Sequence, residues 1–80
     1  MFSDKFSIKI ASLPYRENLV AEIYYNHEQW VEISQETNDL LIVQFYSPLE
    51  GKYWEFDLEE ALEVLQTAKK KLVALEVKRE

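Results

Sequence analysis

The sequence contains no cysteine, one histidine, one glycine and two prolines among its 80 residues. The absence of cysteine excludes disulfides, thiolate nucleophiles and zinc–thiolate sites. With Gly51 as its single glycine, the chain has no glycine-rich loop that could cradle a phosphate. No apolar run approaches the roughly 18 residues of a membrane span, and the N-terminus has no basic-then-apolar signal peptide. We therefore expect a cytoplasmic protein without membrane contact.

Positive charge is scarce in the middle of the chain. Nine Lys and Arg residues stand against fifteen Asp and Glu residues, which gives a net charge of −6. From Glu17 to Glu63 there are twelve carboxylates and a single cation, Lys52, so this stretch carries −11. Such a block repels a phosphate backbone or an anionic membrane, and it attracts a basic protein. The charge pattern predicts a basic protein partner and no nucleic acid, with simple solubility as the other interpretation.

The length and composition predict one globular domain over residues 1–80. Apolar residues make up 48% and charged residues 30%, which is ordinary for a globular chain and too apolar for a disordered one. A domain of this size buries only about 60% of its unfolded surface, so we expect a thin core.

Short alternating or apolar runs, separated by polar residues and turn residues, are typical of strands. The polar residues from Asn26 to Gln29 predict a four-residue hairpin loop, and Pro48 with Gly51 predicts a later turn. On this pattern we place strands at about 6–11, 19–25, 30–35, 40–46 and 53–56.

The pattern of the residues after position 56 predicts a helix at about 58–77. Asp57 and Glu60 have the spacing of a capping box. An apolar stripe at helical spacing consists of Leu58, Ala61, Leu62, Leu65, Ala68, Leu72 and Leu75, with Val64, Val73 and Val77 placed on the opposite side. The sequence thus predicts an α+β fold: an antiparallel meander sheet of four to five strands with one C-terminal α-helix packed on one face.

One helix covers one face of such a sheet, which leaves the other face free. The side chains assigned to that second face include many large rings among carboxylates, and Tyr and Trp are enriched in recognition surfaces. A bulge in any strand would exchange its two faces. The predicted partner-binding residues are Glu22, Tyr24, Trp30, Glu32, Tyr46, Tyr53 and Glu55. The alternatives are a homodimer that uses this face for self-association and an open face with ordinary strand-forming residues.

Catalytic patterns are missing. His27 lies alone in a predicted turn, and no serine stands in a nucleophile-elbow context. Glu22 and Glu32 face each other across the predicted hairpin, but acid–base chemistry needs a cleft that a sheet with one helix hardly offers. Nothing resembles an EF-hand loop. We expect no enzyme, no cofactor and no metal site.

The chain also resembles small bacterial proteins of uncharacterised or immunity type. The stretches that carry the resemblance are 7–12, 18–24, 32–36 and 54–58 followed by the amphipathic helix. The resemblance implies a protein that neutralises a toxin by binding it, and it transfers no functional residue. We expect a small acidic, non-catalytic protein-binding module, an inhibitor or immunity-type protein that masks a basic target. The alternative is a homodimeric structural or accessory protein.

Overall fold

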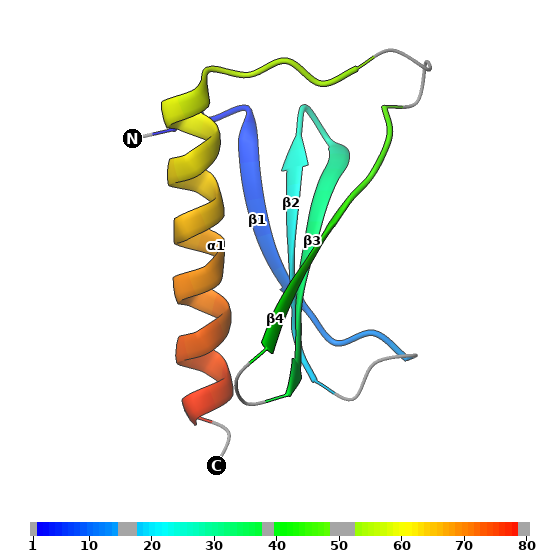
Figure 1. Cartoon of the computed structure of the whole chain (residues 1–80), viewed down its shortest axis with the longest axis vertical. Helices are drawn as coiled ribbons and strands as arrows, with labels where there is room; N and C mark the ends of the chain where they lie inside the picture. The colour runs from blue at the N-terminus through cyan, green and yellow to red at the C-terminus, as the bar shows by residue number, and fades with distance from the viewer. Residues whose placement is uncertain (1, 15–17, 38–39, 49–52, 79–80) are drawn as a thin grey trace.

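The structure, a computed structural model, describes residues 2–14, 18–37, 40–48 and 53–78 (Figure 1). These residues form one open sheet of four antiparallel strands and one long helix. In chain order the elements are β1 (Phe6–Ala11), β2 (Val20–Tyr25), β3 (Glu28–Thr37), β4 (Leu40–Phe45) and α1 (Leu58–Lys78). The predicted α+β meander with a C-terminal helix on one face is confirmed.

The sheet has the order β1-β2-β3-β4, so β1 and β4 are its two edges. Each strand pairs antiparallel with the next, as expected for short connections. The helix α1 packs against β2 and β1 and makes far less contact with β3 and β4. Figure 1 shows its N-terminus at the same end of the sheet as the turn between β2 and β3. We call the face toward α1 the helix-side face and the opposite one the open face.

The predicted fifth strand at 53–56 is wrong. Residues 53–57 form an irregular connection that runs across the end of the sheet to α1 (Figure 1). The Trp54 indole Nε1 donates a 2.7 Å hydrogen bond to the Tyr46 carbonyl, and the Phe56 ring lies 4.8 Å from the Trp30 ring. The alternation of apolar and polar residues here reflects side chains that close the end of the core, not a backbone paired in the sheet.

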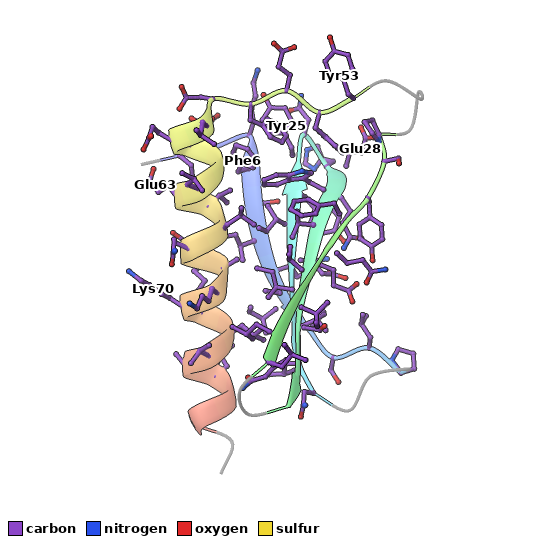
Figure 2. The ribbon with its side chains drawn as sticks, in the orientation of Figure 1. Phe6, Tyr25, Glu28, Tyr53, Glu63 and Lys70 are labelled. Carbon is purple, nitrogen blue, oxygen red and sulfur yellow. The ribbon has the colours of Figure 1, made fainter. Side chains whose placement is uncertain are left out.

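The hydrophobic core lies between α1 and the helix-side face. The strand register places predicted core residues of β1, β2 and β3 side by side, for example Ile8 opposite Ile23 and Ala21 opposite Ile33. Figure 2 shows Phe6 between the helix and the sheet. The buried members are Phe6, Ala21, Ile23, Trp30, Val31, Ile33, Val64, Ala68 and Leu72.

A β-bulge in β3 overturns the placement of Trp30 on the open face. Ile23 pairs with Val31, whereas Tyr24 pairs with Gln29, so Trp30 is the extra residue of β3. A bulge of this kind turns two successive side chains to one face. Trp30 therefore joins the core and is only 6% exposed.

The side of α1 that packs on the sheet differs from the predicted apolar stripe. The side chains of Val64, Ala68 and Leu72, spaced four residues apart, are fully buried against the sheet. Leu58 and Leu62 are exposed, although the predicted stripe includes both as buried residues and puts Val64 on the opposite side. The N-cap half of the predicted capping box is present at Asp57, whose carboxylate accepts a 3.0 Å hydrogen bond from the Glu60 N–H. The Glu60 carboxylate accepts a 3.0 Å hydrogen bond from the Ser3 N–H. The helix is therefore rotated about its axis relative to the predicted orientation. The apolar side of α1 that carries Leu58 and Leu62 remains exposed.

The β2–β3 hairpin turns in two residues, fewer than the four predicted. Asn26 and His27 both have positive φ, at 52° and 69°. Two-residue hairpins of type I′ need positive φ at both central positions, and Asn followed by Gly is the preferred pair. Asn tolerates this conformation, whereas His27 stands where glycine is favoured.

Replacing His27 by glycine should stabilise the protein by about 0.5–1 kcal/mol, because glycine reaches positive φ without a Cβ clash. The free energy of unfolding from urea denaturation, followed by far-UV circular dichroism, measures the change. Asn26→Ala is the matched control and should destabilise by about 1 kcal/mol. A less stable His27→Gly variant would contradict the role given to this turn.

Candidate functional site

Polar side chains form a row across the open face of the sheet. In the strand register Lys9 stands opposite Glu22, Glu22 opposite Glu32, and Glu32 opposite Gln44. Like charges directly opposite each other destabilise a sheet. The pairing of Glu22 with Glu32, predicted from the sequence, is thus present and needs compensation.

Two tyrosines supply part of that compensation. The Tyr24 hydroxyl donates a hydrogen bond of 3.2 Å to Glu22, and the Tyr46 hydroxyl donates one of 3.0 Å to Glu32. Hydrogen bonds to charged acceptors are stronger than those between neutral groups. We call Glu22, Glu32, Tyr24 and Tyr46 the carboxylate–tyrosine cluster.

The carboxylate–tyrosine cluster is largely internal. Glu22 is 8% exposed and Glu32 only 2% exposed, so neither carboxylate offers a partner much surface. Tyr24 and Tyr46 are partly buried, and the Lys9 ammonium lies 5.7 Å from the centre of the Tyr24 ring. The Tyr24–Glu22 bond lies within β2, whereas the Tyr46–Glu32 bond ties the end of β4 to β3. The cluster therefore presents little negative charge to solvent.

The environment of Tyr24 raises the pKa of its phenol above the ordinary value of 10.0, first through burial and then through the charge and hydrogen bond of Glu22 and the charge of Glu32. The folded state thus holds this proton more tightly than the unfolded state. The resulting stabilisation is fully present below pH 10 and is lost as pH rises through the pKa of the folded state.

We therefore expect Tyr24 to ionise at a pH above the ordinary tyrosine pKa of 10.0 in an alkaline titration. NMR of the tyrosine Cζ carbons records the titration curves, and the curve that is lost in Tyr24→Phe belongs to Tyr24. Glu22→Gln should shift the Tyr24 curve to lower pH, because it removes the neighbouring charge. Ionisation of Tyr24 at or below pH 10.0 would contradict the described environment.

Only part of the predicted binding site comes together. Trp30 lies in the core on the other side of the sheet. Tyr53 and Glu55 lie in the connection before α1, outside the sheet, and Tyr53 projects from the end of the molecule with 81% of its surface exposed (Figure 2). The remaining four predicted residues are the carboxylate–tyrosine cluster. A continuous aromatic and carboxylate-rich surface of all seven residues is not formed.

The more open surface lies on the helix-side face, where sequence reasoning did not place a site. A groove of about 350 Å³ runs between α1 and the edge strand β4. Apolar side chains dominate it, with one amide and one ammonium at the side of the helix. We call it the α1–β4 groove; it is lined by Ile33, Leu41, Ile42, Val43, Phe45, Leu62, Leu65, Gln66 and Lys69.

The α1–β4 groove exists because α1 is set toward the β1 side of the sheet. The register places Val43 opposite Ile33 and Phe45 opposite Val31, so both belong to the helix-side face. Their partners on β3 are buried, whereas Val43 and Phe45 are 46% and 59% exposed. Leu62 on the uncovered flank of α1 is 49% exposed. Floor and wall of the groove are thus both apolar and both accessible.

The strand β4 is also a sheet edge, with which no further strand pairs among the described residues. Its sequence, from Leu40 to Phe45, contains no charged residue and no proline. Leu40 and Ile42 are exposed on the other side of the strand. Natural edge strands usually carry charges, prolines or bulges that prevent pairing with another chain. The open edge and the groove beside it form one apolar region.

Neither a metal centre nor a membrane-spanning helix occurs in the parts of the chain that the structure describes. No three His, Cys, Asp or Glu side chains in these ranges converge in a way that could hold a metal ion. No helix in these ranges is long and apolar enough to cross a bilayer.

Comparison of the chain with protein-family models, with curated proteins and with solved structures finds no match. The resemblance to immunity-type proteins therefore stays a prediction, and the candidate site rests on the geometry of this molecule.

Proposed function

We propose that this chain is a non-catalytic protein-binding module and that its partner docks in the α1–β4 groove. The observation that carries the proposal is the joint exposure of Val43, Phe45 and Leu62 on the floor and wall of one groove. Contiguous exposed apolar surface of this kind marks interaction sites in small soluble domains. Covering a partner's surface is also what the predicted inhibitor role requires.

The charge supports a basic partner. The net charge of −6 attracts a basic protein from a distance and raises the association rate at low salt. Short-range affinity then comes from apolar side chains, because buried anchors supply most of the binding energy in an interface. In this proposal the negative charge raises the rate of association, and apolar contacts in the groove supply the affinity.

The lining of the groove supports a binding role over catalysis. Its polar side chains among the described residues are Gln66 and Lys69, and the rest are aliphatic or aromatic. General acid–base chemistry needs titratable side chains within hydrogen-bond reach of the reacting atoms, and Lys69 is the one titratable side chain among the described residues of this lining.

A photocrosslinking amino acid at position 45 tests the proposal in the cells that produce the protein. Gln44 is the matched control, because successive residues of a strand point to opposite faces. The proposal predicts crosslinks to one protein from position 45, and to the same protein from position 62, but none from position 44. Crosslinks from position 44 alone would instead support the open face as the binding surface.

Self-association is the second candidate, favoured by the uncharged edge of β4. Two copies of an uncharged strand can pair antiparallel without charge repulsion. Sedimentation equilibrium over a hundredfold range of concentration distinguishes the candidates. A constant monomer mass supports binding of a different protein, and a concentration-dependent dimer that Ile42→Lys abolishes supports self-association.

A further inference from the structure

The space above β4 has the width of one helix. α1 packs on β2 and β1, and neighbouring strands lie about 4.8 Å apart. A second helix placed two strands further along the sheet, over β3 and β4, would lie about 10 Å from α1. This is the usual distance between packed helices. Among the described residues, α1 therefore covers one half of the helix-side face, and the other half is wide enough for one more helix.

The size of the α1–β4 groove suits the anchor side chains of such a helix. Its volume of about 350 Å³ accommodates two or three large apolar side chains. A helix presents that number of side chains on one face, at positions i, i+3 or i+4, and i+7. The six residues of β4 span about 20 Å, which matches a helix of about 14 residues.

A second copy of this chain does not supply a suitable helix. Two sheets can face each other, each helix over the other copy's β4, only about a two-fold axis parallel to α1. The side of α1 that would then lie on β4 carries Glu63 and Lys70, which point away from their own sheet (Figure 2). Pressing these charged groups onto the apolar side chains of Val43 and Phe45 would remove their hydration, which is costly for a charge.

An added strand is also a poor occupant. A strand that pairs with the edge of β4 extends the sheet in its own plane. The apolar surface of Phe45 and Leu62, which lies above that plane and beside α1, would stay exposed to water. A helix covers both residues at once.

The charges of α1 define the direction of the occupant. Lys69 lines the groove in the C-terminal half of α1. Glu59 lies seven residues, or two turns, before Gln66 and so stands on the same line near the N-terminal end. A complementary helix has acidic residues beside Lys69 and basic residues beside Glu59. Because helices favour acidic residues in their first turn and basic residues in their last, that helix runs antiparallel to α1.

From this geometry we infer that the α1–β4 groove binds an amphipathic helix of a partner protein, antiparallel to α1, with acidic residues in its first turn and basic residues in its last turn. The inference rests on the proposed function and adds the chemistry of the partner segment.

Two synthetic peptides of about 14 residues test the inference. Both carry leucines at i, i+3, i+4, i+7 and i+11 and a hydrocarbon staple on the polar face, so both are helical. One has Glu in the first turn and Lys in the last turn, and the other has these charges exchanged. Titration into the full-length 15N-labelled protein, with fluorescence anisotropy for the Kd, compares them.

The matched peptide should bind about fivefold more tightly than the exchanged peptide at low ionic strength, and the difference should disappear in 1 M salt. Lys69→Glu should abolish the preference, because each peptide then meets one like charge and one opposite charge at positions 69 and 59. Lys70→Glu, which changes the same charge outside the groove, should leave the sign of the preference unchanged. Chemical-shift changes should centre on Val43, Phe45 and Leu62.

Equal affinity of the two peptides for the wild-type protein, or shift changes centred on the open face, would overturn the inference. So would the absence of binding by either peptide. Each of these results leaves the proposed function standing if position 45 still crosslinks to a protein partner. Absence of crosslinks from positions 45 and 62, by contrast, would remove the proposed function itself.

Discussion

Replacing Trp30 by alanine is expected to cost about 3–5 kcal/mol of the free energy of unfolding, as for other large aromatic residues in cores. The Trp30 ring lies 5.9 Å from Phe6, 4.8 Å from Phe56 and 6.0 Å from Phe45, so its removal opens a cavity where several elements meet. The whole free energy of unfolding of an 80-residue domain is only about 4–12 kcal/mol. Urea denaturation followed by circular dichroism should show a partly or wholly unfolded variant.

Tyr53→Ala is the control for this experiment, because Tyr53 was predicted for the same surface and is almost fully exposed. Its substitution should change the free energy of unfolding by no more than about 0.5 kcal/mol. If Trp30→Ala were as stable as Tyr53→Ala, Trp30 would have to lie outside the core, and the predicted open-face placement would be right after all.

The placement of Trp30 shows where strand periodicity stops being informative. The alternation along β1 and β2 predicts which residues enter the core, because a regular strand alternates strictly between two faces. A bulge shifts this alternation by one residue. Val31 and Ile33 keep their predicted face, and Trp30 alone changes sides. Nothing in the residue types from Glu28 to Ile33 identifies the extra residue, since every one of them is compatible with a strand.

The sequence predicts that the residues of the carboxylate–tyrosine cluster lie close together, but it does not predict how deeply they are buried. Hairpin pairing brings Glu22 opposite Glu32, and period-two alternation brings the two tyrosines to the same face. Burial of Glu32 depends on the shape of the sheet and on the loops around it, which the sequence pattern does not contain. Charge counting therefore overestimates the acidity that this face presents to a partner.

The α1–β4 groove had a sequence signal that the predicted stripe left unused. Val64 belongs to the buried side of α1, and the apolar arc of the helix also includes the exposed Leu58 and Leu62. Such an arc is wider than the part of a helix that packing on one sheet can bury. The run from Leu40 to Val43 is apolar on both faces of an edge strand. An apolar arc that is too wide and an edge strand that is apolar on both sides together indicate a contact outside the domain.

Leu62→Gln is expected to weaken binding of the crosslinked partner by about 2 kcal/mol, roughly 30-fold in Kd, if Leu62 anchors the interface. Leu62 is half exposed in the free protein, so its replacement by a residue of similar helix propensity removes little core packing. The free energy of unfolding should therefore fall by less than about 1 kcal/mol. Loss of binding without loss of fold is the signature of an interface residue.

Lys70→Gln is the matched control, because it introduces the same side chain into α1 at a position that points away from the sheet (Figure 2). It should leave the Kd within about threefold, since a single peripheral charge mainly changes the association rate. Isothermal titration calorimetry with the purified partner measures both variants, and circular dichroism confirms that both are folded. Equal affinity of the two variants would place the contact elsewhere, and weaker binding by Glu22→Gln alone would return it to the open face. A selective loss at Leu62 would show that the surface left bare by the rotation of α1 is the one that a partner covers.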